Sequence, residues 1–67
     1  MPARVYRLTV EGEMGAAMRE AFSDFSVHTD SGQTTLTGTL PDQAALYTVI
    51  ERLQSLGLEL VRVTPDR

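Results

Sequence analysis

The side chains that could form a polar site in this chain are one histidine and an arginine on predicted strands. His28 is the only histidine among the 67 residues, and an imidazole titrates near neutral pH. A general base also needs a positioned partner, and the nearest carboxylate in the sequence is Asp30. The end of a hairpin explains Asp30 better, because Asp favours turn formation there. We therefore treat Arg7 and His28 as a candidate polar site and predict no catalytic residue.

Two acidic residues beside a glycine, Glu11 and Glu13, are the remaining pattern that could bind a ligand. A carboxylate pair needs further oxygen ligands to hold a divalent cation, and none cluster nearby in the sequence. Gly12 and Gly15 lack the Lys and the Ser or Thr that complete a phosphate-binding loop. The chain has no cysteine, which excludes a thiolate zinc site. The sequence predicts neither a metal nor a cofactor.

The charge balance argues against nucleic acid as a partner. Six arginines, no lysine and nine acidic residues give a net charge of −3, and such a domain has no general attraction for a phosphate backbone. No apolar run approaches the roughly 20 residues that cross a bilayer. The first residues alternate as a strand does, unlike a signal peptide. We expect a cytoplasmic protein that does not bind membranes.

The N-terminal half changes its hydrophobic period at each turn signal. Residues 4–10 alternate as a strand, with Leu8 and Val10 on one face and Arg7 on the other. Apolar residues then recur at helical spacing, and we expect all of them to face the core: Met14, Ala17, Met18, Ala21 and Phe22. A second strand follows over 25–29, and residues 30–33 supply the Gly-containing loop of a hairpin.

The C-terminal half contains a strand, a helix and a return strand. Threonines alternate with Leu36, Gly38 and Leu40 over 34–40, which indicates a strand with one solvated face. Asp42 is a natural helix N-cap. The apolar stripe of the following helix comprises Leu46, Val49, Ile50, Leu53 and Leu56. Gly57 then predicts a helix end of the Schellman type, with the next strand over 58–63.

This order of elements is that of the ferredoxin-like βαββαβ sandwich, an α+β fold. Right-handed crossovers place both helices on one face of a four-stranded antiparallel sheet, with strand order four, one, three, two. We expect a single domain over residues 1–67. The other face of the sheet is left open, and we expect it to carry Val5, Arg7, Thr9, Ser26, His28, Thr35, Thr37 and Thr39.

The last strand offers apolar side chains to both of its faces. Leu58 and Leu60 alternate onto one face, whereas Val61 and Val63 fall on the opposite face. Either a β-bulge resets the alternation, or a partner covers the second face. Tyr47 points away from the apolar stripe of its helix and is also available to a partner. The candidate interface residues are therefore Val5, Tyr47, Val61 and Val63.

Residues 34–46, which read Thr-Thr-Leu-Thr-Gly-Thr-Leu-Pro-Asp-Gln-Ala-Ala-Leu, and the Leu-Gly-Leu return at 56–58 carry a family resemblance. The chain resembles a group of similarly short bacterial proteins whose function is unknown. The resemblance covers the C-terminal half, with weaker agreement in the first strand and at Phe22. Such proteins tend to have tryptophans in the first helix, where this chain has Met14 and Met18. The resemblance implies a fold and no activity.

These patterns favour a small non-enzymatic domain that associates with itself or with a protein partner. The first alternative is a regulatory domain of the ACT type, which holds a small molecule between chains. The second is an enzyme of the dimeric-barrel kind, which requires His28 and Arg7 to line an enclosed cavity. Because one fold supports many activities, the fold alone does not choose between them.

Overall fold

A four-stranded sheet carries the two helices of this protein, as the computed structural model shows for residues 3–66. In chain order the elements are β1 (Arg4–Glu11), α1 (Ala16–Ala21), β2 (Ser26–Asp30), β3 (Gln33–Leu40), α2 (Gln43–Ser55) and β4 (Leu60–Pro65). The chain is thus of the α+β class. Of the domain expected over 1–67, residues 1, 2 and 67 lie outside the described residues.

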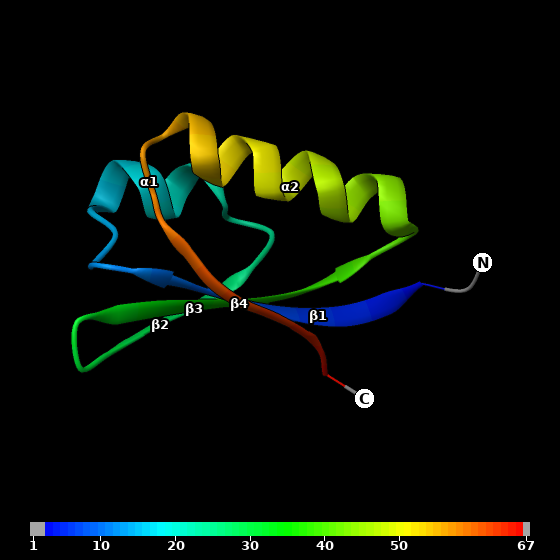
Figure 1. Ribbon diagram of the computed structural model, residues 1–67, viewed down its shortest axis with the longest axis horizontal. Helices are drawn as coiled ribbons and strands as arrows, with labels where there is room; N and C mark the ends of the chain where they lie inside the picture. Colours follow the sequence, from blue (N-terminus) through cyan, green and yellow to red (C-terminus); the bar gives the residue numbers. More distant parts are fainter. Residues whose placement is uncertain (1–2, 67) are drawn as a thin grey trace.

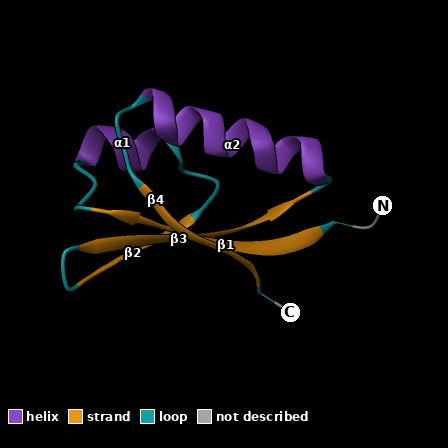
Figure 2. Cartoon of the chain, viewed as in Figure 1, coloured by secondary structure: helices purple, strands orange, loops and turns teal. Residues whose placement is uncertain are grey.

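The sheet is antiparallel throughout, and its strand order is β2-β3-β1-β4. β1 and β3 form the centre, so β2 and β4 are the two edges. Both helices lie on the same side of the sheet, which leaves its other face uncovered by the described elements (Figures 1 and 2). Neither described helix has the length and hydrophobicity to span a membrane.

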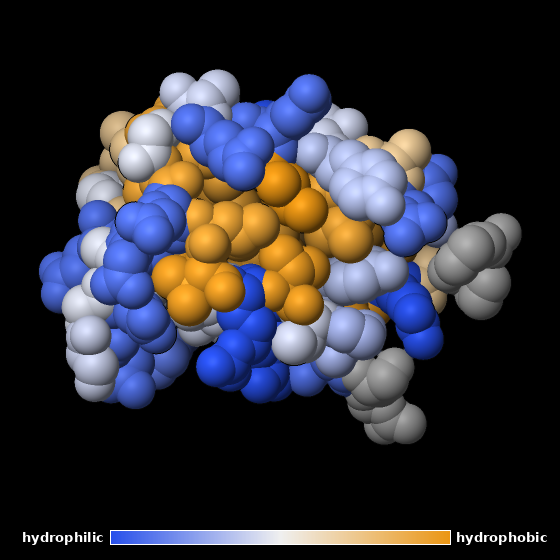
Figure 3. Space-filling model, viewed as in Figure 1, coloured by the Kyte–Doolittle hydropathy of each residue, from blue (hydrophilic) through white to orange (hydrophobic). Residues whose placement is uncertain are grey.

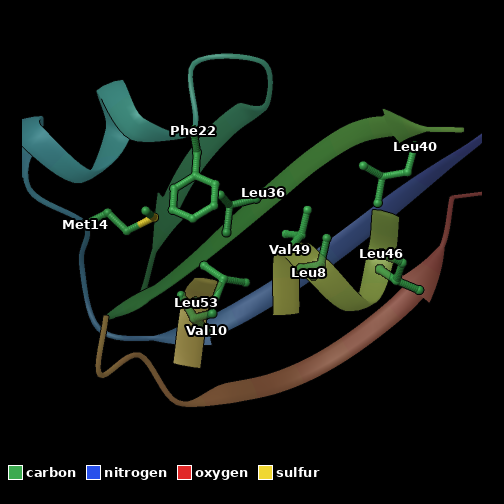
Figure 4. Close-up of a cluster of buried hydrophobic side chains, with 9 residues drawn as sticks. All are labelled: Leu8, Val10, Met14, Phe22, Leu36, Leu40, Leu46, Val49 and Leu53. Carbon is green, nitrogen blue, oxygen red and sulfur yellow. The ribbon is translucent and has the colours of Figure 1, made fainter. Parts of the chain in front are cut away.

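The core fills the space between the sheet and the helical layer formed by α1 and α2. Figure 4 shows its nine buried side chains: Leu8, Val10, Met14, Phe22, Leu36, Leu40, Leu46, Val49 and Leu53. Burying one such side chain fully contributes about 1.5–3 kcal/mol. One polar residue, Thr34, is also fully buried, and its hydroxyl donates to the carbonyl oxygen of Gly12 at 2.7 Å. That bond removes the cost of an unpaired buried hydroxyl.

Two local signals define α2. Asp42 is the N-cap, and its carboxylate accepts a hydrogen bond from the Ala45 amide at 2.8 Å. At the other end, Gly57 has a φ of 81°. The amide of Gly57 donates to the Gln54 carbonyl, and the amide of Leu58 donates to the Leu53 carbonyl. This pair of bonds is the Schellman motif that the sequence predicts.

α1 is only six residues long and differs from its sequence prediction. Met14 and Phe22 are buried and Met18 is partly buried, but Ala17 and Ala21 are exposed, so the expectation for these two alanines was wrong. The reason is that only one narrow stripe of so short a helix, spaced every four residues, can reach the sheet. Met14 itself precedes the helix.

One arginine of α2 ties the end of α1 to the rest of the fold. The Nη2 of Arg52 donates to the carbonyl oxygen of Ala21 at 2.9 Å. Its guanidinium carbon lies 4.5 Å from the centroid of the Phe22 ring, a cation–π distance. The carbonyl of Ala21 is one of those that a helix leaves unpaired at its C-terminus. Arg52 therefore compensates for the shortness of α1.

The residue that leads into β2 packs on a glycine of β3. A Cβ atom placed on Gly38 would lie 2.6 Å from the Cδ2 of Phe25, so the aromatic ring occupies the space that any larger residue would need. The ring of Phe25 also meets the ring of Phe22 edge to face, with centroids 6.2 Å apart. Gly38 is thus required by close packing.

Candidate functional site

The open face of the sheet is polar, as the alternation in the sequence predicts. The strand register aligns its side chains in rows that cross the sheet. One row contains Ser26, Thr37, Arg7 and Thr64, and the next contains His28, Thr35, Thr9 and Arg62. Side chains opposite each other in such rows are near enough to interact.

Arg7 is already paired within the chain. Its Nη2 donates to the Oδ1 of Asp66 at 2.7 Å, and the two side chains are 52% and 37% exposed. Arg7 lies directly opposite Thr64, so the ion pair runs diagonally across β1 and β4 to the residue two positions further on. The sequence analysis missed Asp66 because 59 positions separate the partners, and no local spacing indicates the pair.

His28 and Arg7 are not brought together. His28 lies on the edge strand β2, whereas Arg7 lies on β1, with β3 between them and a different row for each. His28 is exposed and has Thr35 as its cross-strand neighbour. The structure therefore does not unite the candidate polar site.

Other polar side chains of the open face pair with one another. Gln33 donates to a carboxylate oxygen of Glu11 at 2.9 Å, and the hydroxyls of Thr9 and Thr35 lie 3.3 Å apart. No group of three or more potential metal ligands occurs among residues 3–66. With the Arg7–Asp66 ion pair, three pairs of polar side chains on this face thus already interact with each other.

A shallow depression lies on the solvent side of α2. Its lining residues are Thr48, Glu51, Arg52 and Ser55, all from one helix. The guanidinium of Arg52 already contacts Ala21 and Phe22, so this charge is engaged within the chain. His28 and Arg7 do not line this depression, whereas the dimeric-barrel alternative requires both of them to line an enclosed cavity.

A β-bulge in β4 decides which way its apolar side chains point. Leu8 pairs with Val63 and Thr9 pairs with Arg62, but Val10 pairs with Leu60, so Val61 is an extra residue in the ladder. Leu60 and Val63 consequently lie on the same, core-facing side. The expectation that Val63 faces away from Leu60 was wrong, and of the two explanations left open for the last strand, the bulge is present.

Val61 remains exposed at the edge, with 45% of its surface accessible. Val63 packs against the core but is only partly buried, as are Leu58, Leu60 and Ile50. Val5 is partly buried on the open face, opposite Thr39, and so lies on the other face of the sheet from Leu60 and Val63. The candidate interface residues on β4 therefore share an apolar region, and Val5 does not belong to it.

Tyr47 lies beside the same region. It is 58% exposed and precedes Ile50 by three residues, which puts the two on one side of α2. Arg52, which contacts the end of α1, lies on the opposite side of the helix. We define the β4-edge surface as Tyr47, Ile50, Leu58, Leu60, Val61 and Val63. Figure 3 shows an apolar area, in orange, over β4 and the adjoining side of α2.

A comparison with protein families gives one match. The family model described as "Domain of unknown function (DUF8691)" matches residues 5–64. The match includes both halves of the chain, whereas the sequence resemblance rests mainly on the C-terminal half. Neither the curated proteins nor the solved structures contain a match to this chain.

Proposed function

This chain belongs to the family described as a domain of unknown function (DUF8691), and we propose that it is a non-enzymatic domain that binds protein through the β4-edge surface. The observation that carries the proposal is the position of the apolar side chains. They gather where the sheet ends, and each keeps part of its surface exposed to solvent.

The two surfaces of the sheet support different roles. On the open face, Arg7 and Glu11 are engaged by other side chains of the chain, so binding a ligand there would first break existing bonds. At the β4 edge, partly exposed apolar side chains would leave water on binding, which is favourable at about 25 cal/mol per Å². The edge backbone of β4 additionally offers unpaired amide and carbonyl groups.

The architecture supports a scaffold for such binding. Read from the β4 edge, the strand order is β4, β1, β3, β2, and both helices cover one face. We assign this arrangement to the ferredoxin-like fold. In that fold the last strand is an edge, so an added strand or a second domain reaches β4 without displacing either helix.

Photo-crosslinking in cells that naturally produce the chain tests the proposal. A photoreactive amino acid in place of Val61 should yield a discrete adduct that contains one additional protein. The same amino acid in place of Thr39, which is exposed on the open face, is the matched control and should yield none. Adducts of equal intensity at both positions, or no adduct at position 61, would contradict binding through this surface.

A further inference from the structure

The pairing of β4 with β1 determines which backbone amide and carbonyl groups of β4 point outward, away from the sheet. The amide of Asp66 donates to the Val5 carbonyl at 2.8 Å. In an antiparallel ladder, hydrogen-bonded pairs recur at every second residue, so the groups of Thr64 and Arg62 also face β1. Those of Val63, between them, face outward and are free to pair with another strand.

The other outward-facing position at this end of β4 is occupied by proline. Pro65 has no amide hydrogen and can only accept. A second strand centred on Thr64 would place Pro65 opposite Val63 and lose the donor on one side. A strand centred on Val63 completes the central pair, because each Val63 amide then meets the other Val63 carbonyl, and it moves Pro65 to the end of the ladder, opposite the bulge residue Val61.

We propose that the protein bound at this edge is a second copy of the chain, with the two β4 strands antiparallel about a twofold axis at Val63. The inference rests on the proposed function, and it specifies the partner. The two sheets then become one sheet of eight strands, with all four helices on the same face. Val61 of each copy lies opposite Pro65 of the other.

Charge complementarity on the open face supports this partner. In this register Arg62 of the second copy lies opposite Thr64, and Asp66 lies two positions further on. On the other side of β4, Arg7 of the same chain likewise lies opposite Thr64, and it forms an ion pair with Oδ1 of Asp66, two positions further on. Arg62 of the second copy can therefore reach Oδ2 along the equivalent diagonal.

The apolar residues are also self-complementary about this axis. Val63 meets Val63 on the helix side, and Ile50 and Tyr47 lie on the side of α2 that faces away from α1. A twofold axis brings the same surface of both copies together, as isologous dimers require. The opposite edge of the sheet is less suited, because Ser26, His28 and Asp30 of β2 are all exposed polar residues.

Sedimentation velocity of the purified chain over a range of concentrations tests the inference, with native mass spectrometry to count the copies. We expect a reversible monomer–dimer equilibrium. Val63→Pro removes the outward amide and leaves the β1 ladder intact, because an edge strand tolerates proline where the amide faces solvent. This variant should remain monomeric at concentrations where the parent chain is dimeric.

Two further pairs of variants keep the test informative if Val63→Pro does not fold. Val61→Asp should weaken dimerisation roughly tenfold or more, since it buries a charge against Pro65, whereas Thr39→Asp should not. Arg62→Glu should weaken the dimer, because it replaces attraction to Asp66 by repulsion, and Arg62→Lys should weaken it less.

A chain that stays monomeric at all concentrations would overturn the second-copy inference, as would a dimer unaffected by both Val61→Asp and Arg62→Glu. A monomeric chain that still crosslinks from position 61 to a different protein in cells would leave the proposed function standing. A dimer in which Val61→Asp and Arg62→Glu both act, while Thr39→Asp does not, supports the register about Val63.

Discussion

Gly38→Ala tests whether the ring of Phe25 fills the space above Gly38 on β3. In most strands this substitution is favourable by about 0.5–1 kcal/mol, because glycine loses more backbone entropy on folding. Here the new Cβ would lie 2.6 and 2.8 Å from two carbons of the Phe25 ring, distances that folded proteins do not accept. The substitution should therefore destabilise the chain although it adds only one methyl group.

The ring has little freedom to move aside. It meets Phe22 edge to face, and the Phe25 amide is bonded to the Phe22 carbonyl at 2.9 Å. Overpacking of this kind costs about 1–3 kcal/mol, and contacts below 3.0 Å place it in the upper part of that range, about 2–3 kcal/mol. Subtracting about 1 kcal/mol for the entropy gain leaves an expected net loss of about 1–2 kcal/mol. For a domain of this size, that loss corresponds to a Tm lower by roughly 4–16 °C.

Urea denaturation followed by circular dichroism measures the change in the free energy of unfolding. A double-mutant cycle with Phe25→Leu supplies the control, because the smaller side chain vacates part of the space above Gly38. In that background Gly38→Ala should be neutral or stabilising. Equal destabilisation with and without the Phe25 ring, or a Gly38→Ala chain as stable as the parent, would refute the reasoning.

Three further substitutions address the ends of the helices, each measured by the same denaturation experiment. Asp42→Ala removes the carboxylate that caps α2 and should cost about 0.5–2 kcal/mol, whereas Asp42→Ser should restore most of that loss. Gly57→Ala places a side chain at a φ of 81° and should cost about 1–2 kcal/mol, and an unchanged midpoint would contradict the Schellman ending. Arg52→Gln loses the cation–π contact with Phe22 and weakens the bond to Ala21, and should cost about 1 kcal/mol. Arg52→Lys, which keeps the charge but not the planar group, should recover only part of this, and full recovery would show that charge alone matters.

The parts of the fold that were predictable from the sequence are those that local chemistry determines. Asp42 and Gly57 define both ends of α2, because a cap and a left-handed residue act within one turn. The alternation in β1 and β3 predicted the buried and open faces correctly. In α1 the same reasoning failed for Ala17 and Ala21, because the spacing indicates which residues share a stripe but not how wide a stripe the sheet can cover.

The candidate site depends more on contacts between distant segments. The position of Val63 follows from a bulge opposite Thr9, and a bulge depends on two strands that are far apart in the chain. The sequence allowed two explanations for β4, a β-bulge or a partner that covers its second face. Only the observed register with β1 shows that the bulge is present. Asp66 carried no signal of its own, since its importance comes from lying next to Arg7 across the sheet.

The short first helix has a consequence for how the protein opens. A helix of six residues is far below the roughly 12–15 at which isolated helices become marginally stable. α1 has no side-chain cap and no fully buried residue of its own, and it is held by its neighbours Met14 and Phe22 and by Arg52. All three strand ladders are formed without it. We therefore expect the amides of α1 to exchange with solvent through a smaller opening than those of the central strands.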